Sequence, residues 1–149
     1  MAQATVTNEA ITIGLDIGYG VVKAFTPQQT VVFPSVCGHA RQMKFQAAEI
    51  TDRYPGEQIK DDEGTWFVGD LALSQLPPPE LLRLRGRTAN EAGIGNVFRR
   101  RLAKVVIGKL LSGITDGRVV HIRLATGLPV SHMTDSQLLI PLDGAQIHP

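Results

Sequence analysis

The sequence predicts an α/β fold, in which a mixed β-sheet is completed by one crossover helix. Three short segments with the alternation of strands follow one another near the N-terminus. Later, a long amphipathic helix precedes another alternating segment. Short strands joined by tight turns form an antiparallel meander, whereas a helix between two strands is typical of a parallel crossover. Together these observations require a sheet that contains both kinds of pairing.

The N-terminal meander is predicted from period-two alternation of apolar residues. The expected strands are residues 11–17, Val21–Thr26 and Thr30–Phe33. Turn-forming residues separate them at Gly18-Tyr19-Gly20 and at Pro27-Gln28-Gln29. Residues 1–10 show no such pattern, and we expect them to form a flexible tail.

The middle of the chain has a different character. Residues 35–64 are polar and weakly periodic, so we expect an inserted, partly irregular excursion there. Thr65–Val68 is a predicted short strand, and Asp70 is the expected N-cap of a brief helix that ends at Gln75. The Pro77-Pro78-Pro79 triplet excludes regular helix and central strand, which makes it the best internal hinge.

The strongest helix prediction covers Asn90–Ser112, with Asn90 as its N-cap and Gly113 as the residue that ends it. Its apolar face consists of Ile94, Phe98, Leu102, Val105 and Val106. Val119–Ala125 alternates again and is the strand that completes the crossover. Beyond it we expect a short helix from Ser131 or Thr134 to Leu139, a turn at Asp143-Gly144 and a strand beginning at Ala145.

Composition limits the classes of protein. A chain of 149 residues with 43% apolar and 19% charged residues is typical of one globular domain. Its net charge of +1 argues against a dedicated nucleic-acid binder. The single cysteine, Cys37, excludes an internal disulfide, favours a cytoplasmic location and is interpreted as a small core residue. No apolar run approaches the ~20 residues that span a bilayer, so no membrane partner is expected.

The first predicted hairpin carries the clearest candidate chemistry. If Tyr19-Gly20 is a two-residue loop closed by Gly18 opposite Val21, then Asp16 lies opposite Lys23. Glycines allow positive φ and close approach of a ligand, and successive N–H groups in a turn can bind an anion. Lys23 supplies a charge for a phosphate oxygen, while Asp16 suits a Mg²⁺ ion held through its waters. An ordinary hairpin with an exposed Asp–Lys pair explains the spacing equally well.

Several motifs in order give this hairpin a context. The string Asp16-x-Gly18-x-Gly20-x-x-Lys23-Ala24-Phe25 resembles the first phosphate motif of the actin-like ATPases. It is followed by Phe33-Pro34-Ser35, by Val68-Gly69-Asp70-Leu71-Ala72 and by Leu124-Ala125-Thr126-Gly127-Leu128-Pro129. In this order the motifs resemble the N-terminal half of the plasmid-segregation actins of the ParM/StbA group, over most of residues 11–147.

The resemblance implies a ribonuclease-H-like, actin-like subdomain over residues 11–149, with a small insert at about residues 35–88. It implies binding of ATP or GTP with Mg²⁺, self-association into filaments, and segregation of DNA that is reached only through an adaptor protein. By position, Asp16 matches the magnesium-associated aspartate and Lys23 matches the phosphate lysine. Gly18, Tyr19 and Gly20 match the phosphate-loop backbone. Tyr19 replaces the small hydroxyl residue of eukaryotic actins, which limits this contact to its backbone.

The family's second glycine-rich motif, water-positioning residue and adenosine pocket are not visible in this sequence. We therefore expect the chain to lack the C-terminal nucleotide-binding half, and no catalytic residue is assigned. Because hydrolysis in such enzymes depends on positioning between two halves, the chain alone is expected to bind nucleotide weakly without turnover. The full-length protein is expected to be an ATPase. A non-hydrolysing actin-like scaffold or adaptor and a sugar-kinase-like enzyme are the alternatives.

Three further features have competing interpretations. Thr126 and Gly127 follow the end of a strand, where ligand sites of α/β folds gather, so both are cleft candidates. A simple strand-ending turn is equally consistent.

The long helix carries positive charge at Arg99–Arg101 and Lys104. A solvated helix face is favoured as the explanation over a filament contact or a site for an acidic partner. Trp66-Phe67 is expected to pack a small core within the insert.

Overall fold

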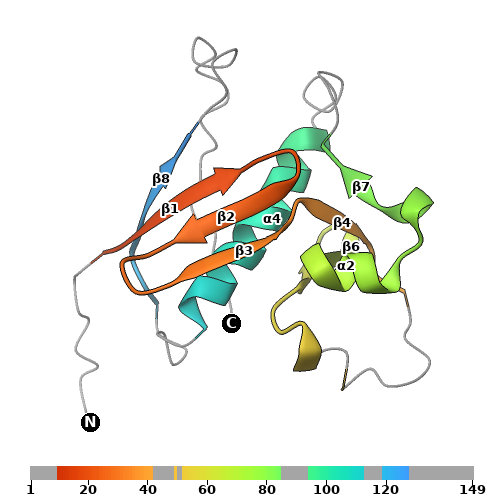
Figure 1. Cartoon of the computed structure of the whole chain (residues 1–149), viewed down its shortest axis with the longest axis horizontal. Coiled ribbons are helices and arrows are strands. Elements are labelled where there is room, and N and C mark those ends of the chain that lie inside the picture. The colour runs from red at the N-terminus through yellow and green to blue at the C-terminus, as the bar shows by residue number, and fades with distance from the viewer. Residues whose placement is uncertain (1–9, 42–48, 50–51, 85–93, 113–118, 128–149) are drawn as a thin grey trace.

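The computed structural model contains two four-stranded sheets that both contact one long helix, α4 (Ile94–Leu111) (Figure 1). The structure describes residues 10–41, 49, 52–84, 94–112 and 119–127. We call the sheet formed by the first three strands sheet A, and the other sheet B. The predicted α/β class, with a mixed sheet and a crossover helix, is confirmed.

Sheet A has the strand order β3-β2-β1-β8. Its strands are β1 (Ile11–Ile17), β2 (Val21–Phe25), β3 (Thr30–Pro34) and β8 (Ile122–Thr126). The first three pair antiparallel, as the meander predicted, and β8 pairs parallel with β1 after the passage through α4. The last strand begins three residues later than predicted, because Val119 is 85% exposed and outside the pairing.

One face of sheet A packs against α4. The alternation of β1 and β2 buries Ile13, Leu15, Val22 and Ala24 on this side. The predicted apolar face of the helix meets them, with Phe98, Leu102, Val105 and Val106 all buried. This face of the helix is therefore confirmed from Phe98 onward, while Asn90, Gly113 and the side chain of Ile94 lie outside the described residues.

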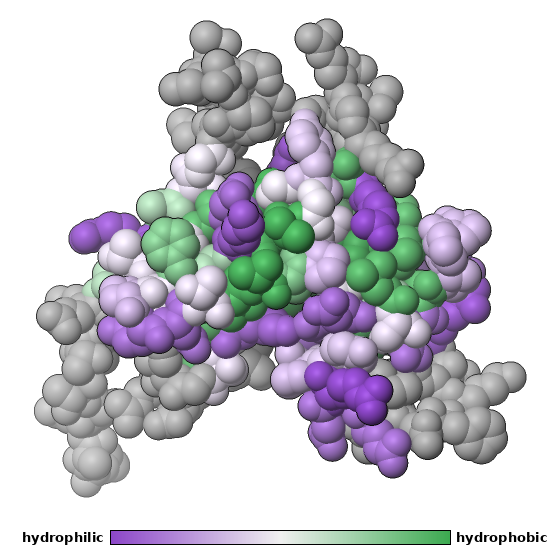
Figure 2. Space-filling model, viewed as in Figure 1, coloured by the Kyte–Doolittle hydropathy of each residue, from purple (hydrophilic) through white to green (hydrophobic). Residues whose placement is uncertain are grey.

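The other face of sheet A is open among the described residues. Val21, Phe25 and Val32 are 40–57% exposed there, and Figure 2 shows hydrophobic side chains over β1–β3 on this side. The Phe25 ring covers Gly14 of the neighbouring strand. A Cβ atom at Gly14 would lie 2.2 Å from that ring, so any larger residue at Gly14 would require this exposed ring to move.

Sheet B has the order β5-β6-β4-β7 and is antiparallel throughout. Its strands are β4 (Val36–His39), β5 (Gln58–Asp61), β6 (Gly64–Val68) and β7 (Leu82–Arg83). The segment of β6 was predicted as a strand, whereas β4 and β5 were not. The expectation of irregular structure was wrong for β4 and β5, which are four residues long. β4 pairs with the distant strands β6 and β7, and β5 forms a local hairpin with β6.

The helix α2 (Gly69–Gln75) follows β6, and a 3₁₀ turn (Pro78–Glu80) follows it within the proline triplet. The short helix was predicted, but Asp70 is not its N-cap. Val68 occupies that position and makes no side-chain capping bond. Instead, a distant carboxylate at Glu57 accepts a hydrogen bond from the N–H of Leu71 at 2.8 Å.

Sheet B and α2 enclose a small core of their own. Phe67 is buried there with Val36, Leu71, Ala72 and Leu76. Trp66 instead belongs to the main core against α4, so the prediction for the Trp66-Phe67 pair is correct only for the phenylalanine. Cys37 is fully buried, which confirms it as a small core residue.

Some predictions concern residues that the structure does not describe. They are the tail before residue 10, the start of the long helix, and the helix, turn and strand expected between residues 131 and 148. Among the described helices, none is long and apolar enough to cross a membrane.

Candidate functional site

The turn between β1 and β2 closes as a two-residue loop. The N–H of Gly18 donates to the carbonyl of Val21 at 3.0 Å, and the strand register places Asp16 directly opposite Lys23. This is the register that the spacing predicted. It puts Asp16 and Lys23 on neighbouring strands, close to the loop residues Tyr19 and Gly20.

Both charged side chains are exposed on the open face of sheet A. In the part of the chain that the structure describes, neither Asp16 nor Lys23 has a hydrogen-bond or ion-pair partner. They are therefore not engaged in holding the fold together. An exposed carboxylate with free oxygens suits an ion such as Mg²⁺, which keeps several of its waters.

The backbone of the turn differs from the prediction in one respect. Among the described glycines, positive φ occurs at Gly56, Gly64 and Gly69, and not at Gly18 or Gly20. The loop glycines therefore do not use the positive φ that glycine allows. Gly18 is favoured for another reason, because a Cβ atom there would lie 3.1 Å from the Val21 carbonyl oxygen.

Ser35 anchors the turn from the side of sheet B. Its hydroxyl donates to the carbonyl of Gly18 at 2.7 Å, and its N–H donates to the carbonyl of Gly20 at 3.0 Å. Within the described residues, the N–H groups of Tyr19 and Gly20 donate to no acceptor. Sequence reasoning quoted Ser35 only as part of a motif and gave it no role, because its partners lie 15 and 17 residues away.

The cleft candidates lie at the same edge of sheet A. Since β8 runs parallel to β1 and pairs Thr126 with Leu15, Thr126 and Gly127 reach the edge where Asp16 and the turn begin. The Thr126 hydroxyl makes only a long contact, 3.5 Å, to the Gly127 carbonyl. The structure thus brings together every site residue that the sequence singled out.

The family is decided by a match over most of the chain. The model of the N-terminal domain of actin-like proteins matches residues 14–140. This chain belongs to that family. No significant match was found among curated proteins.

Solved structures show the same fold. The apo psk41 ParM protein has a TM-score of 0.60 and 20% identity, and the match covers 86% of this chain and 39% of that one. ParM in a 15-stranded filament from Clostridium botulinum has a TM-score of 0.55 and 24% identity, over 83% and 36%. The archaeal actin homolog Ta0583 has a TM-score of 0.50 and 17% identity, over 82% and 33%. The actin-like domain therefore spans 33–39% of the length of these chains.

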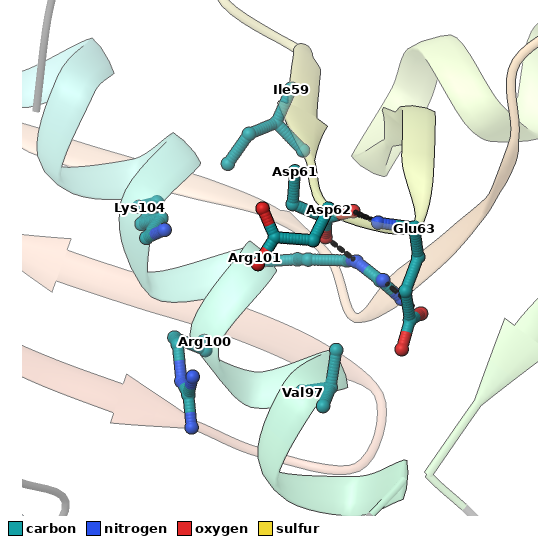
Figure 3. Close-up of a pocket in the computed structure, with 8 residues that line it drawn as sticks. All are labelled: Ile59, Asp61, Asp62, Glu63, Val97, Arg100, Arg101 and Lys104. Carbon is teal, nitrogen blue, oxygen red and sulfur yellow. Dashed lines mark hydrogen bonds and ion pairs between the residues drawn. The ribbon is translucent and has the colours of Figure 1, made fainter.

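A second group of charged residues in the actin-like domain surrounds a pocket between α4 and the β5–β6 hairpin (Figure 3). Its lining residues are Ile59, Asp61, Asp62, Glu63, Val97, Arg100, Arg101 and Lys104. Arg101 extends from α4 toward the hairpin and donates to Asp61 at 2.6 Å and to Glu63 at 2.5 Å. Its guanidinium also lies 3.5 Å from the centre of the Trp66 ring.

Arg101 corrects the interpretation of the basic run as a solvated face. Its side chain is 5% exposed, whereas its neighbour Arg100 is exposed. Partial burial raises the pKa of Asp61, but the hydrogen bonds from Arg101, the Glu63 N–H and Trp66 outweigh that effect and hold this pKa below its usual value. The pair is thus charged at neutral pH and joins sheet B to the helix.

The thiol near this group is inert. Burial raises the pKa of Cys37 to about 11, and the neighbouring Arg101 offsets only part of that rise. Because the thiolate is the nucleophilic form, Cys37 is not a candidate for catalysis at neutral pH. In the pocket between α4 and the β5–β6 hairpin, Arg101 is already paired and the nearby thiol is unreactive. The β1–β2 turn, whose charged groups are unpaired among the described residues, is therefore the better candidate site.

Proposed function

We propose that this chain is the part of a ParM-like actin-type protein that holds the phosphates of a nucleotide. The observation that carries the proposal is the β1–β2 turn, where, among the described residues, two N–H groups without acceptors lie between an unpaired carboxylate and an unpaired ammonium. Such a turn can bind an anion through its backbone. The family membership and the resemblance of residues 16–25 to the phosphate motif of actin-like ATPases support the same assignment.

Each site residue has a proposed role. The N–H groups of Tyr19 and Gly20 donate to phosphate oxygens, with Gly18 shaping the turn, and Lys23 adds a charge-assisted hydrogen bond. Asp16 holds a Mg²⁺ ion through the ion's waters, and the bound ion would neutralise phosphate charge. Thr126 and Gly127 form the neighbouring edge of the cleft. ATP is the proposed nucleotide, with GTP as the alternative.

The whole protein is proposed to be a filament-forming ATPase in the cytoplasm that moves plasmid DNA through an adaptor. The solved ParM filament from Clostridium botulinum supports self-association of this kind. We propose that residues of about 35–88 form its insert subdomain. Because the chain spans 33–39% of the similar structures, it supplies only some of the contacts that hydrolysis needs. We therefore expect weak binding and no turnover by this chain alone.

Titration of the ¹⁵N-labelled chain with ATP–Mg²⁺, followed by NMR, tests the site. We expect saturable shifts centred on the amides of Tyr19, Gly20 and Lys23. In Lys23→Met the affinity should fall about 10-fold, because a charge-assisted hydrogen bond is lost. Lys60→Met, which changes an exposed strand lysine of sheet B, is the matched control and should bind like the parent.

Two results would contradict the proposal. One is a set of shifts that leaves the turn unaffected, and the other is equal affinity of Lys23→Met and Lys60→Met. A micromolar dissociation constant or clear turnover by this chain would contradict the expectation of weak binding. Sedimentation of the full-length protein with and without ATP tests filament formation separately.

A further inference from the structure

We propose that Ser35 is a positioning residue of the phosphate turn, whose hydroxyl fixes the direction in which the Tyr19 N–H points. The inference rests on the proposed function of the β1–β2 turn. It goes beyond that function because Ser35 touches no ligand and acts only through the backbone of Gly18.

The contacts of Ser35 are those of a rigid anchor. The residue is fully buried and connects the end of β3 to the start of β4. Since β3 pairs with β2 and β4 pairs with both β6 and β7, the position of Ser35 is set by both sheets. From there it donates one hydrogen bond to the Gly18 carbonyl and another to the Gly20 carbonyl.

Because the peptide group is planar, anchoring the Gly18 carbonyl also fixes the direction of the Tyr19 N–H. The carbonyl of Gly18 and the N–H of Tyr19 belong to one planar trans peptide, so they point in opposite directions. With the carbonyl held toward the buried Ser35 hydroxyl, the N–H of Tyr19 is held pointing away from it. The same reasoning applies to the Gly20 carbonyl and the N–H of Val21.

Hydrogen bonds also occupy some of the carbonyl oxygens that would repel an anion near the turn. Three of the carbonyl oxygens in or beside the turn accept a hydrogen bond: Gly18 and Gly20 from Ser35, and Val21 from the N–H of Gly18. The Tyr19 carbonyl accepts none among the described residues. The N–H groups of Tyr19 and Gly20 are left without acceptors among the described residues. An approaching phosphate therefore meets two unpaired donors, while three of the nearby carbonyl oxygens already accept a hydrogen bond.

Substitution Ser35→Ala removes the hydroxyl and keeps the backbone N–H. We expect the affinity for ATP–Mg²⁺ to fall about 3- to 10-fold, the effect of one hydrogen bond. Before nucleotide is added, ¹⁵N relaxation should show increased motion of the Tyr19 and Gly20 amides. Ser35→Cys should be intermediate, because a thiol is a weak donor. Ser74→Ala, which removes a 2.9 Å hydroxyl–carbonyl bond in α2, should change neither measurement.

The inference is overturned if Ser35→Ala keeps both the parent's amide order at Tyr19 and the parent's affinity. It is also overturned if Ser74→Ala weakens binding as much, since the loss would then be general. If the parent itself gives no ATP–Mg²⁺ shifts, the proposed function fails, and the amide order without nucleotide still shows whether Ser35 fixes the turn. Should Ser35→Ala fail to fold, Ser35→Cys provides the same comparisons.

Discussion

Arg101 joins sheet B to the long helix through charge. It is nearly buried, lies over the Trp66 ring and bonds to carboxylates from both ends of the β5–β6 turn. A buried cation is costly unless its partners are in place, so removing either side of the pair leaves an uncompensated charge. Arg101 therefore contributes to the docking of the hairpin on α4.

We expect Arg101→Met to lower the free energy of unfolding by roughly 1.5–3 kcal/mol, the range for hydrogen bonds to charged groups. The adjacent Arg100→Met is the matched control, because Arg100 is exposed and has no partner among the described residues, and it should change stability by less than about 0.5 kcal/mol. Urea unfolding followed by the fluorescence of Trp66, the single tryptophan, measures both. Equal effects of the two substitutions would show that the buried pair does not stabilise the domain.

The ion pair between Arg101 and Asp61 makes the free energy of unfolding depend on pH. The pKa of Asp61 is lowered in the folded state, so the stability it contributes is present above the unfolded value of about 3.9. That stability is lost as the pH falls through the lower, folded-state pKa. The difference in unfolding free energy between parent and Arg101→Met should therefore shrink on acidification below about pH 4. A difference that is constant down to pH 2 would contradict this.

At the residue scale, prediction from sequence succeeded where the partners are local. Asp16 and Lys23 are seven residues apart and are brought together by one hairpin, so period-two alternation was enough to pair them. The partners of Arg101 lie 38 and 40 residues away, and its place in a run of three arginines favoured a solvated interpretation. The burial of Ser35 depends likewise on both sheets and has no local signal.

At the scale of elements, α2 shows how a distant side chain can replace a local cap. Glu57 is 2% exposed, accepts the Leu71 N–H and forms an ion pair with Lys109 of α4. Gly69 adopts a φ of 64°, and a Cβ atom there would lie 3.1 Å from the Glu57 carboxylate. The start of α2 is thus set by its packing against Glu57 and not by Asp70.

Glu57→Ala should destabilise the domain by about 1.5–3 kcal/mol, because it leaves the Leu71 N–H and the Lys109 ammonium without their partner. Asp70→Ala should cost only about 0.3–1 kcal/mol, which is the effect of a carboxylate near a helix N-terminus. Thermal or urea unfolding of the two variants compares these values. If Asp70→Ala costs as much as Glu57→Ala, the local cap predicted from the sequence is correct after all.

The elements that sequence reasoning found are those with a regular pattern of sufficient length. The three strands of the meander and the apolar face of α4 follow from alternation and helical spacing. The strands β4 and β5 escaped prediction because each has four residues and little apolar character. At Gly38 in β4, a Cβ atom would lie 2.4 Å from the Leu76 side chain and 2.8 Å from the Glu80 carbonyl oxygen, so glycine here allows the chain after α2 to pack closely against the strand.

At the scale of the molecule, the fold places the β1–β2 turn beside the point where the chain passes from sheet A to sheet B (Figure 1). The turn is anchored to that passage by Ser35. Within the part of the chain that the structure describes, the Tyr19 and Gly20 N–H groups and the side chains of Asp16 and Lys23 have no protein partner. The helix α4 contacts both sheets, and the ion pair between its Arg101 and Asp61 joins it to sheet B. The fold thus presents a supported turn whose polar groups are exposed at one end of sheet A.

The most direct test replaces Mg²⁺ by paramagnetic Mn²⁺ and measures the broadening of amide signals by Mn²⁺–ATP, with Mn²⁺ alone as the control. If the β1–β2 turn holds the phosphates and the ion, ATP-dependent broadening should be strongest for residues 16–20 and Lys23 and should weaken with distance from them. Broadening centred on Asp61, Asp62 and Glu63, or the same pattern without ATP, would contradict the assignment of this turn as the nucleotide-phosphate site.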